Sequence, residues 1–207
     1  MKKLFVLIIA MLFLPVVNAT QFKEGVHYDV IAEQASAKPE VAEYFSYYCP
    51  HCNEFEPVMT DVTKRLADTE IKVEKNHVSF IGRAMGVEMQ KAFATAELLN
   101  VEHEVSMALF AAIHEQKRHF SSRDDIRTVF TDAGIDGQKF DAAINSFAVD
   151  GKVTRMDKNT ADKKIRGVPA LIVNDKYQIN MSSLQASGEE FNIKLAELIK
   201  YLAAKTD

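Results

Sequence analysis

The sequence predicts an α/β protein in which a sheet domain is interrupted by a block of helices. Four β-like segments, at about 26–31, 41–48, 71–80 and 171–179, lie near the two ends of the chain. Between them, from about 82 to 147, apolar residues recur at the three- and four-residue spacing of helices. An amphipathic pattern over 189–204 predicts a closing helix. This order indicates one sheet built from both flanks and a helical insertion.

Composition limits the classes of protein to consider. The chain has 207 residues, of which 47% are hydrophobic and 26% charged, and this excludes disordered and low-complexity classes. The net charge of −4 does not favour a nucleic-acid partner. Two cysteines are too few for a disulfide-stapled scaffold or a zinc ribbon.

Residues 1–19 predict a cleaved signal peptide. Lys2 and Lys3 precede an unbroken apolar run over 4–14, and small residues lead up to Ala19. The run is short for a membrane span, although an uncleaved anchor is the alternative. We therefore expect a mature chain from Thr20 onward, exported to an oxidising compartment and not inserted in the membrane.

The mature chain is expected to divide into two units. Residues 20–81 and 148–207 form the sheet domain, and residues 82–147 form the helical insertion. Helices are expected over 137–147 and 153–165, and a hairpin over 171–179. Both residues of its turn, Asn174 and Asp175, are expected to take positive φ.

The strongest chemical signal is Cys49-Pro50-His51-Cys52, which follows a strand and opens a helix. Thiol–disulfide chemistry needs an accessible attacking sulfur, here Cys49, and a resolving sulfur one turn behind it, here Cys52. Pro50 suits the first helical turn, and His51 can add a donor or a positive charge. The helix terminus stabilises a thiolate on Cys49 by at most about 2 kcal/mol. A stabilised thiolate stabilises the reduced form, so the disulfide becomes a stronger oxidant.

Two alternatives to a redox-active dithiol are less favoured. A structural disulfide across a two-residue gap would constrain almost no loop. A zinc site would need two further ligands, such as His51, His77 or a more distant histidine. We therefore expect no metal and no cofactor beyond the disulfide itself.

Other residues fit a redox site. Val168-Pro169 precedes a strand, where a cis peptide could present backbone to a substrate. Glu43 lies in the apolar strand before Cys49 and could accept a proton or tune the thiols. Lys75, in the next strand, is its expected partner, with a structural ion pair as the alternative. Glu56 is expected to face water, and no role is expected for the other histidines, His27, His103, His114 and His119.

The run over 43–52 resembles the active-site strand and helix of the DsbA family of periplasmic thiol:disulfide oxidoreductases. Further matches lie at Lys75, at His77-Val78 and over 125–135, 166–170 and 176–178, so the resemblance covers essentially the whole mature chain. It departs from the family pattern in a hairpin turn without Gly, in the absence of Trp, and over 181–190, which is expected to border the substrate groove.

The resemblance implies a thioredoxin fold with an inserted all-helical domain. It also implies that Cys49 forms a mixed disulfide, that Cys52 resolves it, that the bond before Pro169 is cis, and that Glu43 and Lys75 tune the site. The implied partners are reduced, unfolded exported proteins and a DsbB-like inner-membrane quinone reductase, and the implied compartment is the periplasm.

Three other functions remain as alternatives. A disulfide isomerase or reductase of the DsbC or DsbG kind would carry an N-terminal dimerisation segment, whereas only residues 20–40 precede the active-site strand here, so a monomer is expected. A chaperone-like binding protein would carry an inert disulfide. A kappa-type glutathione transferase would carry Ser in place of Cys49 and lack the second cysteine.

Overall fold

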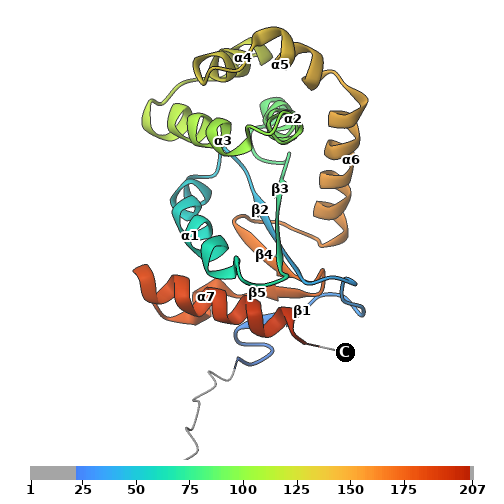
Figure 1. Ribbon diagram of the computed structural model, residues 1–207, viewed down its shortest axis with the longest axis vertical. Coiled ribbons are helices and arrows are strands. Elements are labelled where there is room, and N and C mark those ends of the chain that lie inside the picture. The colour runs from blue at the N-terminus through green and yellow to red at the C-terminus, as the bar shows by residue number, and fades with distance from the viewer. Residues whose placement is uncertain (1–21, 206–207) are drawn as a thin grey trace, which may run out of the picture.

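Five strands form one mixed sheet in the part of the chain described by the computed structural model, residues 22–205 (Figure 1). The predicted signal peptide lies outside these residues. The strand order is β1-β5-β4-β2-β3, with β2 and β3 parallel and the other pairs antiparallel. The strands are β1 (Tyr28–Val30), β2 (Glu40–Phe45), β3 (Lys72–His77), β4 (Ala170–Val173) and β5 (Tyr177–Ile179).

Helices lie around the sheet and in a separate block above it (Figure 1). Helices α1 (Pro50–Leu66) and α7 (Gly188–Ala203) pack against each other and share a core with the sheet. Helix α6 (Phe147–Asp162) runs from the block back along β3. The block consists of α2 (Ala84–Leu98), α3 (Glu102–Phe110), the π-helical turn η1 (Ala111–Glu115), α4 (Arg123–Asp132) and α5 (Gly137–Ile144). The 3-10 turn η2 (Met181–Leu184) lies outside the block and precedes α7. None of the helices between residues 22 and 205 is long and apolar enough to cross a membrane.

The hydrophobic core of the helical block extends into the end of β2. Phe45, Tyr47, Cys49 and Cys52 are buried in one cluster with side chains of α2 to α6. The opposite end of the sheet is buried against α1 and α7 in a second cluster. The segment that joins β2 to α1 therefore lies where the helical block meets the sheet.

The predicted α/β architecture, with helices inserted between strands of one sheet, is confirmed. The hairpin prediction is also confirmed, because Asn174 and Asp175 have φ of 50° and 58°. Asn174 is suited to this position since its side chain accepts from the Glu40 N–H and donates to the Ala203 carbonyl. The division at 82 and 148 stays a prediction.

Several predicted boundaries are wrong: the strand expected over 71–80 ends at His77, and the helix expected over 137–147 ends at Ile144. Two further differences have identifiable reasons. The helix expected over 153–165 begins earlier, at Phe147, because the Ser146 side chain accepts from the Val149 N–H and caps it. The strand expected over 41–48 ends at Phe45, because the Cys49 N–H donates to the Ser46 carbonyl and turns the chain into α1.

Gly86 is predicted to be essential for the passage from β3 into α2. An added Cβ would lie 2.2 Å from the Ile81 carbonyl oxygen and 2.4 Å from that of Ser79. We expect Gly86→Ala to lower the free energy of unfolding, measured in urea, by about 1–3 kcal/mol. The control is Gly151→Ala in α6, where the Cβ meets nothing within 4 Å and helix propensity should add about 0.5–1 kcal/mol. Equal stability of the two variants would contradict this reading.

Candidate active site

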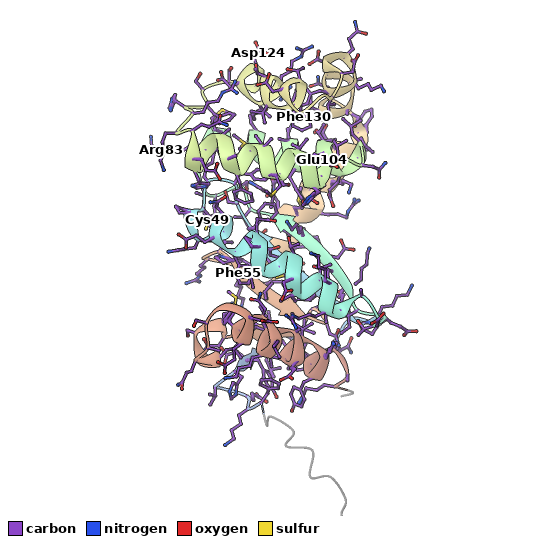
Figure 2. All side chains as sticks on the ribbon, turned by 60° about the vertical axis from the view of Figure 1, so that its left-hand side comes forward. Cys49, Phe55, Arg83, Glu104, Asp124 and Phe130 are labelled. Atoms are coloured by element: carbon purple, nitrogen blue, oxygen red, sulfur yellow. The ribbon has the colours of Figure 1, made fainter. Side chains whose placement is uncertain are left out.

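Cys49 lies at the N-terminal end of α1 (Figure 2), and Cys52 lies in the first turn of this helix, as predicted. Cys49 is the N-cap residue and Pro50 follows in the first turn. The Cys52 N–H donates to the Cys49 Sγ over 3.2 Å. Cys49 retains 6% of its accessible surface and Cys52 none. Cys49 is thus the more accessible sulfur, although it is more buried than an exposed attacker was expected to be.

No disulfide joins the two thiols in this structure. Burial, followed by the hydrogen bond with Cys49, holds the pKa of the Cys52 thiol well above its usual range. Cys52 therefore stays protonated at neutral pH. The backbone N–H at the Cys49 sulfur favours negative charge there.

Val168 and Pro169 lie beside the reactive sulfur. The bond between them is cis, as the resemblance implied. The Cys49 Sγ lies 3.4 Å from the Val168 carbonyl oxygen and donates to it as a thiol. Residues 119 positions apart in the chain thus meet at this sulfur.

A shallow groove of about 390 Å³ begins next to the cysteines. His51 and Pro50 are exposed at this end of α1, and no hydrogen bond of His51 occurs among the described residues, so its role as a donor stays a prediction. The segment expected to border a groove does so, through four of its residues. The lining consists of His51, Glu54, Phe55, Pro169, Met181, Ser182, Gln185, Ala186 and Phe191.

Glu43 is completely buried beneath the active-site helix. Neither oxygen of its carboxyl group has a hydrogen-bond partner in the structure. Burial raises its pKa to about 8, and the nearby Lys75 charge offsets this only in part. The carboxyl is therefore mainly protonated at neutral pH.

Lys75, the expected partner of Glu43, interacts with it through charge and makes no hydrogen bond to it. Although the two residues are neighbours across β2 and β3, the Lys75 Nζ donates to both oxygens of Glu56, at 2.7 and 2.9 Å. The Glu102 carboxyl lies 3.5 Å from the same Nζ. Glu56 was expected to face water, but its side chain is only 14% exposed. Lys75 therefore acts on Glu43 through its charge alone.

Sequence reasoning missed the contacts of Tyr47. Its N–H donates to the His77 Nε2 over 3.1 Å, and its carbonyl accepts from the His114 Nε2 over 2.7 Å. Its hydroxyl lies 2.8 Å from the Ser106 Oγ. His114, for which no role was expected, thus contacts the turn before Cys49, and no local pattern signals this contact because it joins residues 67 positions apart.

His77 does not belong to a metal site in the described part of the chain. Burial lowers its pKa to about 3, so the ring is neutral. No group of three or more His, Cys, Asp or Glu residues that could hold a metal occurs between residues 22 and 205. The zinc alternative thus has no ligand cluster there.

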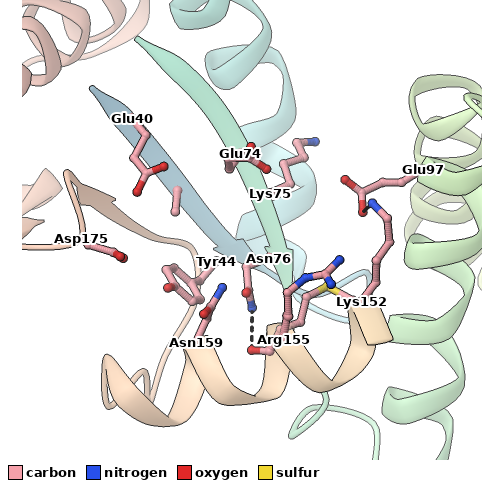
Figure 3. Close-up of a pocket in the computed structure, with 12 residues that line it drawn as sticks. Glu40, Tyr44, Glu74, Lys75, Asn76, Glu97, Lys152, Arg155, Asn159 and Asp175 are labelled. Carbon is pink, nitrogen blue, oxygen red and sulfur yellow. Dashed lines mark hydrogen bonds and ion pairs between the residues drawn. The ribbon is translucent and has the colours of Figure 1, made fainter. Parts of the chain in front are cut away.

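A second cavity, of about 240 Å³, lies between α6 and the sheet, and neither cysteine lines it (Figure 3). Its lining mixes acidic and basic side chains with amides and a tyrosine. The labelled residues are Glu40, Tyr44, Glu74, Lys75, Asn76, Glu97, Lys152, Arg155, Asn159 and Asp175.

Thiol–disulfide exchange is the chemistry that two sulfurs in this arrangement can perform. With a sheet interrupted by helices, the site defines a thioredoxin-like oxidoreductase. The comparisons specify the family. The family of the DSBA-like thioredoxin domain matches residues 40–192.

Similar proteins match over nearly the full length. The thiol:disulfide interchange protein DsbA of Salmonella typhimurium is 38% identical, covering 99% of this chain and 100% of that protein. The DsbA of Escherichia coli is 36% identical with the same coverage. The crystal structure of DsbA from Proteus mirabilis is 36% identical, with a TM-score of 0.82, and covers 89% of this chain and 98% of that chain.

This chain therefore belongs to the DsbA family. It is a thiol:disulfide oxidoreductase of the dithiol oxidase kind, with a thioredoxin fold and an inserted helical domain. The resemblance seen in the sequence is confirmed.

The buried Glu43 makes stability depend on pH. An unfolded glutamate titrates near 4.5, whereas folded Glu43 titrates near 8. Between these values the folded protein holds a proton that the unfolded chain has lost, so its free energy of unfolding falls as pH rises. This contribution is complete below pH 4.5 and is lost as pH passes about 8.

We expect Glu43→Gln to remove this fall in the free energy of unfolding with rising pH. The variant should be similar to the wild type at pH 4 and more stable by a few kcal/mol at pH 9, as measured by urea unfolding. Glu197→Gln, at an exposed position of α7, is the control and should follow the wild type at every pH. A difference between Glu43→Gln and the wild type that does not change with pH would contradict the assignment.

Proposed function

We propose that this protein works in the periplasm and donates a Cys49–Cys52 disulfide to reduced, unfolded exported proteins. The observation that supports this most is the asymmetry of the pair: Cys49 reaches the surface beside a groove, and Cys52 is fully buried behind it. A client sulfur can therefore approach Cys49 only. The predicted signal peptide over 1–19 supports export.

The reaction consists of two exchanges. A client thiolate attacks the Cys49 Sγ, the Cys49–Cys52 bond breaks, and Cys52 leaves and takes up a proton. A second client thiolate attacks the client sulfur of the mixed disulfide, and Cys49 leaves as a thiolate. The client loses two electrons and gains a disulfide, and the enzyme becomes a dithiol.

The neighbouring residues have distinct proposed roles. Cys52 takes up a proton readily because burial raises its pKa, and the nearby Glu43 carboxyl is protonated at neutral pH and can supply it. Lys75 adjusts the charge around Glu43. Val168 and Pro169 border the Cys49 sulfur, where they can contact the client backbone.

Client segments are proposed to lie in the groove that begins at His51 and Pro169. A DsbA from Proteus mirabilis that is 35% identical, with a TM-score of 0.82, has been solved with a non-covalently bound peptide. That structure supports peptide binding in this family. Phe55, Met181 and Phe191 give this groove apolar surface for unfolded clients.

Turnover requires reoxidation of the dithiol. We propose a DsbB-like quinone reductase of the inner membrane as the partner that accepts two electrons from Cys49 and Cys52. The enzyme is proposed to act as a monomer and to need no cofactor apart from its own disulfide.

The reduction potential of the pair tests the direction of the reaction. We expect a value well above the thioredoxin value of about −270 mV, because a thiolate stabilised at the helix terminus favours the reduced form. The mature protein would be equilibrated in graded glutathione buffers, and the reduced fraction read by mass after thiol alkylation, since the chain has no Trp. A potential at or below that of thioredoxin would instead indicate a reductase.

Substitution of each cysteine separates the two sulfurs. Cys49→Ser is expected to abolish disulfide transfer to a reduced client protein, because no sulfur remains at the groove. Cys52→Ser has no disulfide to donate, but when it is given a client that already contains a disulfide, its Cys49 thiolate should attack one client sulfur and displace the other as a thiolate. The resulting mixed disulfide should resolve slowly and be visible on a non-reducing gel. Retained client binding and function in Cys49→Ser would favour a chaperone with an inert disulfide.

A further inference from the structure

The chain enters Cys49 through a turn over residues 46–49, and hydrogen bonds fix the central peptide of this turn. The Cys49 N–H donates to the Ser46 carbonyl over 3.0 Å and closes a four-residue turn. The central peptide of this turn joins Tyr47 to Tyr48. Rotation of that peptide would change the direction in which the chain enters Cys49, so its hydrogen bonds affect the position of the reactive sulfur.

Two histidines from different parts of the fold hold Tyr47. His77 of β3 accepts the Tyr47 N–H, so its own proton lies on Nδ1. His114 of η1 contacts the Tyr47 carbonyl over 2.7 Å, and because a carbonyl can only accept, the His114 Nε2 donates. The sheet thus holds one side of Tyr47, and the helical block holds the carbonyl of the central peptide.

His114 lies within the π-helical turn η1. In η1 the Gln116 N–H donates to the Ala111 carbonyl, five residues back, instead of the usual four. This widened turn shifts the side chains that follow around the helix axis, and such turns are frequent at functional sites. Phe110, one turn earlier, packs on both the His114 ring and the Tyr47 ring, at centroid distances of 6.0 and 5.1 Å.

The Tyr47 carbonyl depends on this donor. Tyr47 is fully buried, and no other donor to its carbonyl occurs among residues 22–205. A buried carbonyl that loses its partner is penalised unless it turns toward another donor or water. Removal of the His114 donor would therefore favour reorientation of the peptide between Tyr47 and Tyr48.

We propose that His114 is a positioning residue for thiol–disulfide exchange at Cys49. Its Nε2–H fixes the central peptide of the active-site turn while the Cys49 sulfur alternates between Cys52 and a client. The helical insertion thereby controls the geometry of the redox pair. This inference rests on the proposed function, because it concerns the same sulfur.

The test compares His114→Ala, His114→Gln and His119→Ala in the full mature protein. The glutamine amide can donate as the imidazole does, and His119 is an exposed histidine five positions away that makes no hydrogen bond among the described residues. Two rates are measured where urea unfolding shows each variant to be folded. They are alkylation of reduced Cys49 by iodoacetamide across a pH series, and disulfide transfer from the oxidised protein to a cysteine-containing peptide.

We expect His114→Ala to slow both rates by about threefold to tenfold, as loss of one hydrogen bond would allow. The alkylation rate should be lower throughout the pH series, because Cys49 is then placed less well at the helix terminus. His114→Gln should restore most of both rates, and His119→Ala should match the wild type.

Two results would overturn the inference. The first is a His114→Ala variant that is less stable yet, when folded, reacts like the wild type, which would make His114 merely structural. The second is a folded His114→Gln variant as slow as His114→Ala, which would exclude the hydrogen bond as the cause. If the wild type itself transfers no disulfide, the proposed function fails, while the alkylation profile still decides the role of His114.

Discussion

The hydrogen bond from the Cys49 N–H to the Ser46 carbonyl ends β2 and directs the chain into α1. It places one sulfur at the N-terminus of a helix and the second one turn inside it. The Cys52 N–H then reaches the Cys49 Sγ, and the strand that follows the cis peptide brings the Val168 carbonyl to the same atom. The exchange chemistry depends on this turn, because the turn places the Cys49 Sγ where the Cys52 N–H and the Val168 carbonyl meet it.

The charges beneath the helix follow from burial. Glu43 has lost its water and has no hydrogen-bond donor, so its carboxyl is easier to keep protonated than ionised. A hydrogen bond from Lys75 would stabilise the ionised form of Glu43, but the Lys75 Nζ donates to Glu56 of α1 instead. The protein thus keeps a buried acid at some cost in stability at high pH, which is common where a proton must be moved.

The helical block and the sheet contribute different parts of the site. The sheet supplies the strand before Cys49, the cis-proline and His77, whereas the block buries Tyr47 and Cys52 and supplies Ser106 and His114. A groove next to the cysteines lies between α1, Pro169 and the segment before α7. None of the residues that line this groove makes a hydrogen bond to Tyr47.

Much of this protein could be predicted from its sequence, because the deciding interactions are local. Cysteine spacing, the proline in the first turn, the periodicity of the inserted helices and the hairpin turn at Asn174 all act over a few residues. The partner of Lys75 and the contacts of Tyr47 with His77 and His114 could not be predicted in this way. Lys75 has acids available on β2, α1 and α3, and only their packing selects Glu56. His114, which lies in a π-helical turn, meets Tyr47 across 67 residues of chain, a contact that depends on tertiary packing and leaves no local pattern.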